Sequence, residues 1–308
     1  MTIEKINNKI SFIFFCFSIA LLIMHYSGLI SSNFLTTYMA LILIITIGVS
    51  HGALDDIKGY KLLKYYKIKN KFIFFLSYVF LALIIVTLWI FFSTLMLILF
   101  LVVASYHFGK EDCWGSEINK SNLNIIKFFL KGSLIIFAPL CMSFNETINI
   151  FNILGVENEI FYNFLNIANE NYLFITFLII SILSNFLIVK KIKKSINLFV
   201  DVIAIINLYA LFSPLVAFTI YFCFLHSIRH SASLTFELDI GIKELIKKTF
   251  RLTALTALLF WMSLTFLVDY QKVDIDSSII TVIFIGLASL TFPHILLEYL
   301  LEKYEKRT

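Results

Sequence analysis

The histidines are the residues of this sequence whose number and placement indicate a chemically active site. Six histidines occur in 308 residues, and one of them, His25, falls toward the opposite end of its apolar segment from the other five. The five are His51, His107, His226, His230 and His294. A single buried histidine is usually explained by a hydrogen bond between helices. Five at one predicted depth favour a shared site, because ionisable groups inside a membrane are costly and mark function.

The spacing of two histidines suits a metal ion. His226 and His230 are four residues apart, so on a helix they are turned by about 40° and offset by about 6 Å. Both imidazoles can then reach one ion, although H-x-x-x-H alone is a weak signal. With His51 and His107 from two other segments at the same depth, they predict a site of four imidazoles.

Carboxylates follow three of the histidines by about one helical turn. The pairs are His51 with Asp55, His107 with Asp112, and His294 with Glu298. A metal-bound histidine usually donates its second ring N–H to such an acceptor, so these acids are expected to orient the ligands. The alternative is that they and their neighbours, such as Glu111, are ordinary charges at the membrane surface.

Two further polar residues are expected beside the metal rather than on it. Arg229 lies between the paired histidines and should face away from them, where one of the acids can balance its charge. His294 follows Pro293, which removes a backbone hydrogen bond and bends the helix. A histidine beside such a bend can reach a carbonyl, a water or Glu298, and thereby support the metal ligands.

The ligand type limits the choice of metal. Imidazole suits zinc, copper, iron and nickel. Zinc usually takes four ligands, so four histidines would close a structural zinc site. Iron(II) is commonly six-coordinate, so four histidines leave positions for O₂ or a substrate, and the set favours Fe(II). Most of the 34 Phe and 14 Tyr residues pack between helices or face lipid, but some could line a slot for a long apolar substrate.

The elements that position these residues follow from the composition. Hydrophobic residues make up 60% of the chain and charged residues only 15%, against about a quarter in a typical soluble domain. Mean hydropathy is +0.91. A soluble domain of this length has too little interior for so much apolar surface, so the composition excludes a soluble enzyme. It predicts an all-α fold, a polytopic integral membrane helical bundle with a single transmembrane domain over residues 1–308.

About 20 apolar residues are needed for each membrane-spanning helix, and the chain offers about ten such segments. The predicted spans lie near residues 10–30, 34–54, 71–91, 93–108, 123–144, 171–189, 196–212, 214–234, 250–270 and 278–300.

The basic residues orient these spans. With the N-terminus inside, nearly all of the 25 Lys and Arg residues fall in inner loops or tails, whereas Lys272 lies in an outer loop. This pattern predicts that both termini are cytoplasmic, that the protein lies in the plasma (inner) membrane, and that the histidines lie toward the cytoplasm. No nucleic-acid partner is expected despite the net charge of +5, because the bases cluster between apolar runs.

The predicted outer loop, residues 145–170, contains four glutamates and no basic residue. Within it, Phe161, Phe164, Leu165 and Ala168 repeat at helical spacing, which predicts a short helix lying in the membrane interface. An ordered polar loop is the alternative.

Four short motifs, in order along the chain, resemble those of one known family. They are SHGALD at residues 50–55, SYHFG at 105–109 followed by Asp112, HSIRH at 226–230, and PH at 293–294 followed by Glu298. On these motifs the sequence resembles the Brp/Blh family of membrane-bound bacterial and archaeal β-carotene 15,15′-dioxygenases. The matches extend over nearly the whole chain.

The resemblance implies an enzyme in which Fe(II), bound by histidines, uses O₂ to cleave the central double bond of β-carotene into two molecules of all-trans-retinal. Carried over by motif, the ligands would be His51, His107, His226 and His230, the set that depth and spacing also select. A rhodopsin that takes up the retinal is the expected partner, inferred from the product.

Other functions remain open. A membrane desaturase or hydroxylase with two irons needs more histidines and an H-x-x-H-H box, which the chain lacks. A haem electron carrier needs only two axial histidines on opposite helices, fewer than gather here. A non-enzymatic Brp-like protein that handles retinal or carotenoid, or a transporter, would keep the same helices without the reaction.

Overall fold

The part of the chain that the structure describes consists of helices and the segments that connect them. The computed structural model describes residues 3–32, 34–113, 124–188 and 192–305, and no strand occurs within these ranges. The side chains of residues 50, 51, 53, 186–197, 237 and 305 lie outside the description. A helix satisfies its backbone hydrogen bonds internally, which is why apolar segments take this form inside a bilayer. The predicted all-α class is confirmed.

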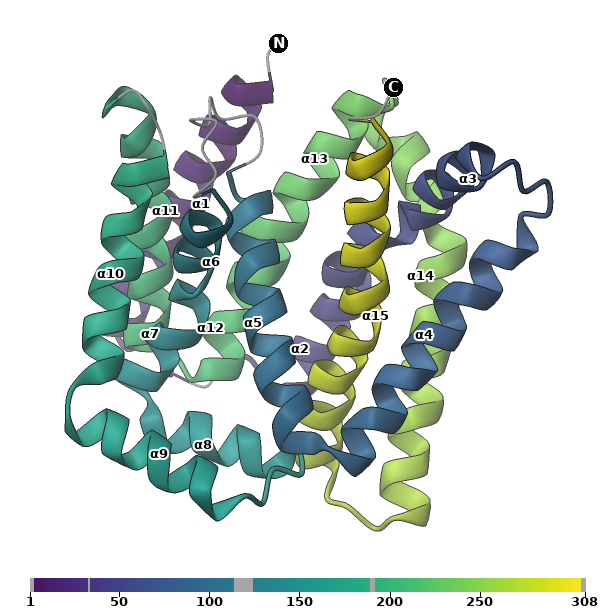
Figure 1. Cartoon of the computed structure of the whole chain (residues 1–308). Helices are drawn as coiled ribbons and strands as arrows, with labels where there is room; N and C mark the ends of the chain where they lie inside the picture. The colour runs from purple at the N-terminus through teal and green to yellow at the C-terminus, as the bar shows by residue number, and fades with distance from the viewer. Residues whose placement is uncertain (1–2, 33, 114–123, 189–191, 306–308) are drawn as a thin grey trace.

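The described ranges hold nineteen helical elements in chain order (Figure 1). They are α1 (Ile3–Tyr26), α2 (Thr37–Leu43), η1 (Ile44–Gly48), η2 (Val49–Leu54), α3 (Asp55–Tyr65), α4 (Phe72–Phe91), α5 (Ser93–Glu111), α6 (Asn124–Gly132), α7 (Leu134–Met142), α8 (Phe144–Ile153), α9 (Glu159–Glu170), α10 (Leu173–Ile188), α11 (Ile192–Leu211), α12 (Pro214–Tyr221), η3 (Phe222–Ser227), α13 (Ile228–Glu237), α14 (Ile242–Thr265), η4 (Phe266–Tyr270) and α15 (Ile275–Glu305). Elements η1, η3 and η4 are π-helical turns, and η2 is a 3₁₀ turn.

Within the described ranges, six helical stretches are long and apolar enough to cross a membrane. They are α1, α4, α5, α6 with α7, α14 with η4, and α15. A seventh exists if α9 and α10, which are bent by 72° at their junction, count as one span. The other predicted spans, near 34–54, 196–212 and 214–234, fall on shorter helices or on helices interrupted by π or 3₁₀ turns. The count of about ten spans therefore stays a prediction.

Two of these interruptions coincide with predicted site residues. The 3₁₀ turn η2 contains His51, and the π-helical turn η3 contains His226. Such turns within helices are uncommon and occur often at functional sites. The other histidines lie on regular helix, with His107 near the end of α5, His230 on α13 and His294 on α15.

Close contact with α6 fixes the end of α5 that carries His107. A side chain at Gly109 would collide with the backbone carbonyl of Phe128, and one at Gly132 would collide with that of Ser105. Glycine at both positions lets the two backbones approach, as small residues do between membrane helices. The contact therefore places His107 and the two acids that follow it.

The two ends of the bundle differ in what they carry. Helix α1 begins and α15 ends at the same end, and α8 and α9 run across the opposite end (Figure 1). Helix α9 buries Leu165 and Ala168 and exposes Phe164. Helix α9 thus lies within residues 145–170, and the assignment of these residues to an outer loop with a helix in the membrane interface stays a prediction.

Candidate metal centre

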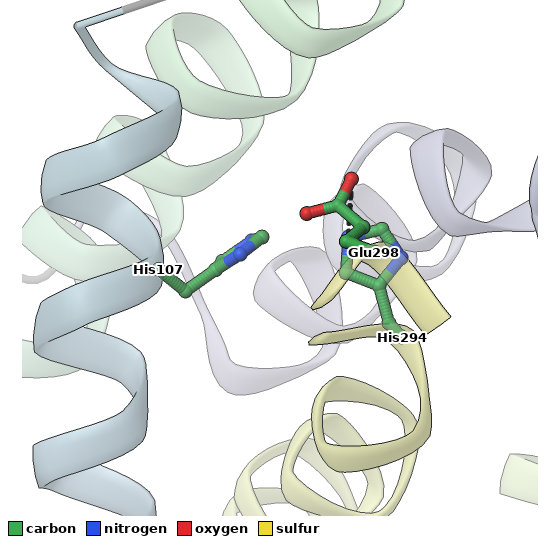
Figure 2. Close-up of side chains that lie close together, drawn as sticks. All are labelled: His107, His294 and Glu298. Atoms are coloured by element: carbon green, nitrogen blue, oxygen red, sulfur yellow. Dashed lines mark ion pairs between the residues drawn. The ribbon is translucent and has the colours of Figure 1, made fainter. Parts of the chain in front are cut away.

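Four of the five histidines predicted at one depth have described side chains, and their rings lie together. The centroids of the rings are 5.4 Å apart for His107 and His226, 5.2 Å for His107 and His294, and 5.8 Å for His230 and His294. All four side chains are buried. Figure 2 shows the His107 ring projecting from α5 toward His294 and Glu298 on α15. Residues 187 positions apart in the sequence thus meet at one point.

The fifth histidine, His51, is placed only by its backbone. It lies within η2, and its side chain is outside the described residues. The same short segment continues into Asp55, whose carboxylate reaches the cluster at His294. The backbone of η2 therefore passes close to the other histidines.

Each of three histidine rings has its Nδ1 atom against a carboxylate. His226 Nδ1 lies 3.3 Å from Asp112 Oδ1, and His230 Nδ1 lies 3.0 Å from Glu111 Oε2. His294 Nδ1 lies 2.9 Å from both carboxylate oxygens of Asp55. A protonated Nδ1 that donates to a carboxylate fixes the tautomer, so Nε2 is the nitrogen that would bind a metal.

Two of these carboxylates contact histidines that lie far from them in the sequence. Asp112 contacts His226 rather than His107, and Asp55 contacts His294, from a different part of the chain. A residue one turn further along a helix lies on nearly the same face but at another height. It can therefore contact a ring that a neighbouring helix brings to that height. Glu298 is the exception, because its Oε1 lies 3.7 Å from Nε2 of His294 one turn earlier.

Two tyrosines hold two of these aspartates. The hydroxyl of Tyr221 donates to Asp112 Oδ2 over 2.8 Å. The hydroxyl of Tyr78 lies 2.9 Å from Asp55 Oδ2 and 3.1 Å from the carbonyl oxygen of Leu290. The site therefore contains two groups of the same design, Tyr221–Asp112–His226 and Tyr78–Asp55–His294.

Arg229 approaches the same Asp112 oxygen, Oδ1, that His226 contacts. Its Nη2 lies 2.9 Å from Asp201 Oδ2 and 2.9 Å from the hydroxyl of Ser11, and its Nη1 lies 3.7 Å from Asp112 Oδ1. The guanidinium is buried, so two carboxylates balance its charge. Through these contacts Arg229 ties α13 to α1 and α11.

Glu298 joins the histidines to a lysine of α3. Lys58 Nζ lies 2.8 Å from Glu298 Oε1. Burial opposes the charge on Lys58, but the carboxylates of Glu298 and Asp55 outweigh it and raise the pKa of its ammonium group above the ordinary value. Possible metal-binding atoms of His107, His294 and Glu298 lie within 4.8 Å of one another, as do those of Glu111, His230 and Glu298.

Sequence reasoning missed four residues of this network. Glu111 was considered only as a surface charge, and Tyr78 and Tyr221 are two of 14 tyrosines with nothing in the sequence to separate them. Asp201 carried a usable signal, because an acid in the middle of the predicted span 196–212 needs a partner.

A cavity of about 870 Å³ reaches the histidines, a size typical of ligand sites. His107, His294, Asp55 and Tyr78 lie in its wall at the inner end. From there it extends along α15 to Thr281, a length of about 20 Å at 1.5 Å per residue. The remaining wall is mostly apolar and aromatic, so the cavity suits a long hydrophobic molecule.

The donor set fits a transition metal. Several imidazoles converge in a buried place, and for three of them a carboxylate at Nδ1 directs Nε2 inward. Neutral imidazoles suit iron, copper, zinc and nickel, and carboxylates around them are the usual supporting groups. The residues present therefore fit the iron that the sequence predicts.

The fold and the site together define a helical membrane protein with a histidine-rich centre at one end of an apolar cavity. Residues 42–302 match the family described as beta-carotene 15,15′-dioxygenase, and the chain belongs to that family. A similar curated protein is the beta-carotene 15,15′-dioxygenase of an uncultured marine bacterium, 66A03. The two chains are 28% identical over 277 residues, which cover 89% of this chain and 97% of that protein. No solved structure matches the chain.

Proposed function

We propose that this protein is an iron-dependent dioxygenase that uses O₂ to cleave β-carotene at its central 15,15′ double bond, giving two molecules of all-trans-retinal. The observation that carries the proposal is the buried histidine cluster at the inner end of an apolar cavity, in a chain of this family. The cavity wall offers few polar groups, which matches a substrate that is a hydrocarbon.

Fe(II) is the proposed cofactor, with His51, His107, His226 and His230 as its ligands. Asp55, Asp112, Arg229, His294 and Glu298 would orient these ligands without binding the metal. Like His226 and His230, His294 has a carboxylate at Nδ1, and in addition Glu298 Oε1 lies 3.7 Å from its Nε2. Contacts with carboxylates at both ring nitrogens suit a residue that supports the site.

The chain's own residues would position the metal ligands and the substrate and exclude water from the site. The carboxylates of Asp112 and Glu111 accept from Nδ1 of their histidines and hold the rings in place. When bound, Fe(II) would supply the chemistry with O₂, and the cavity walls would decide which double bond of the polyene lies at the metal. The buried setting keeps bulk water from the reacting atoms.

The proposed setting is the plasma membrane, with about ten spans, both termini cytoplasmic and the metal centre toward the cytoplasm. The product suggests a rhodopsin as the acceptor of retinal. Lys61 and Glu157 are exposed near opposite ends of the bundle. A membrane-impermeant thiol reagent should label Lys61→Cys only in inverted vesicles and Glu157→Cys in intact cells. The reverse pattern would put the metal centre on the outer side.

Expression in a bacterium that accumulates β-carotene tests the reaction. We expect the pigment to bleach and retinal to accumulate, and both changes to stop without O₂. Apocarotenals of unequal length would mean cleavage at another bond. Bound iron without any turnover would favour the alternative of a non-enzymatic carotenoid-handling protein or transporter. An intact carotenoid that has gained a hydroxyl group would favour a hydroxylase, and one that has gained a double bond would favour a desaturase.

A further inference from the structure

One side of the histidine-lined cavity reaches the outer surface of the bundle between α4 and α14. Several residues both line the cavity and are exposed, which places them at its rim. On α4 these are Val79, Leu83 and Ile90, and on α14 they are Leu255, Leu259, Met262 and Ser263. Leu83 is 60% exposed and Leu259 is 51% exposed, so the rim is open on both helices.

The two helices leave this opening because each is packed mainly against other elements. Helix α4 lies against α15, α5 and α3, and α14 lies against η2 and α15. Figure 1 shows α4 and α14 at one edge of the bundle, on the side of α15 away from α10 and α11. Of the described side chains of α4, only Trp89 is buried.

The surface around the opening is the kind that faces hydrocarbon. Both helices are long and apolar enough to cross a membrane, and their exposed residues at the rim are apolar except for Ser263. The inner end of the same cavity holds His107 and His294. The cavity therefore connects the lipid-facing side of the protein to the histidine centre.

We propose that the opening between α4 and α14 is the entrance through which the carotenoid passes sideways from the bilayer to the histidine centre. This inference rests on the proposed function. A hydrocarbon polyene dissolves in the bilayer, and its passage through water would expose all of its apolar surface. A route that stays in contact with lipid and apolar side chains avoids that exposure.

Bulky residues at the rim test the entrance. Leu83→Trp and Leu259→Trp are made alone and combined. Each replaces a leucine with a larger side chain, so the combined variant narrows the opening from both sides. The matched controls are Leu76→Trp on α4 and Leu258→Trp on α14, which are 61% and 54% exposed and stand outside the described lining of the cavity. All variants are reconstituted in vesicles containing β-carotene, and their iron content is measured.

Two readouts are taken on each variant. The first is the cleavage rate at limiting β-carotene, where slowed access lowers kcat/KM more than kcat. The second is the β-carotene that co-purifies with metal-free protein after brief exposure to the vesicles. We expect the combined rim variant to lose about tenfold or more in both kcat/KM and pigment uptake, because gating steps can limit turnover. The controls should match the wild type.

The outcomes separate the entrance from the reaction. Rim variants that equal their controls in uptake and in kcat/KM would overturn the entrance and leave a wild type that cleaves β-carotene unaffected. A wild type that takes up pigment but does not cleave it would reject the proposed function, while slowed uptake in the rim variants would still support the entrance. A wild type that takes up no pigment would overturn the entrance.

Discussion

Two groups of the same design flank the histidine cluster, and their surroundings differ. Tyr221, Asp112 and His226 are buried against Arg229 and are not among the described residues that line the cavity. Tyr78, Asp55 and His294 all line the cavity. The same Tyr–Asp–His arrangement thus occurs once away from the cavity and once in the cavity wall. We propose that the first group holds the metal and that the second acts at the cavity, where the substrate would lie.

The largest effect should come from removing a ring of the buried group. His226→Ala should lose most of its iron and all measurable cleavage, because a proposed ligand is missing and Asp112 loses one of its partners. His51→Ala, His107→Ala and His230→Ala should behave alike. Iron bound to the purified variants is the measurement.

His25→Ala is the control for these substitutions. His25 lies in the last turn of α1, and its ring packs against the ring of Phe212 with 5.9 Å between centroids. This variant should keep both iron and activity. Iron retained in two of the four cluster variants would remove those histidines from the ligand set.

On the cavity side, His294→Ala should keep its iron and lose activity by about 10–100-fold, the size typical of groups that support a metal ligand. Asp55 and Glu298 face its two ring nitrogens, so its loss should disturb the cavity end of the site rather than release the metal. Iron content and retinal formation must be measured on the same preparation. Loss of iron equal to that in His230→Ala would make His294 a ligand and erase the contrast.

The aspartates should divide in the same way. Asp112→Asn removes the charge that accepts from His226, so iron affinity should fall by about 10–100-fold. Asp55→Asn should leave iron affinity nearly unchanged and lower the cleavage rate. Iron titration followed by activity at saturating iron separates the two effects. Equal losses of iron affinity in both variants would show that both Tyr–Asp–His groups support iron binding.

The smallest effects belong to the tyrosines. A neutral hydrogen bond contributes about 1 kcal/mol, so Tyr221→Phe and Tyr78→Phe should change their readouts by less than about tenfold. Tyr221→Phe should weaken iron binding, whereas Tyr78→Phe should change KM for β-carotene, because only Tyr78 lines the cavity. A change in KM for Tyr221→Phe alone would reverse the assignment.

The sequence was sufficient for the helical class and for the convergence of the histidines. Hydropathy and the basic residues put the histidines at one depth, and the structure brings the described rings of His107, His226, His230 and His294 together. Depth is a position along the membrane normal, so hydropathy and the placement of basic residues along the sequence can predict it.

The pairing between helices could not be predicted in this way. Sequence neighbours suggested Asp112 beside His107, but Asp112 serves His226 from another helix. Which faces meet depends on how helices pack, and that packing depends on contacts such as Gly109 against α6. The helix interruption at η3 also has no clear pattern in the sequence, because no proline or glycine lies inside it, whereas η2 contains Gly52.

The most direct test loads the purified protein with Fe(II), supplies β-carotene and O₂, and compares it with His226→Ala from the same purification. Iron per chain and all carbonyl products are measured on each sample. The wild type should bind iron and form retinal as the only major carbonyl product, and His226→Ala should do neither. Retinal formed by the iron-free variant, or a wild type that binds iron and leaves β-carotene intact, would contradict a histidine-held iron centre that cleaves the polyene at its middle.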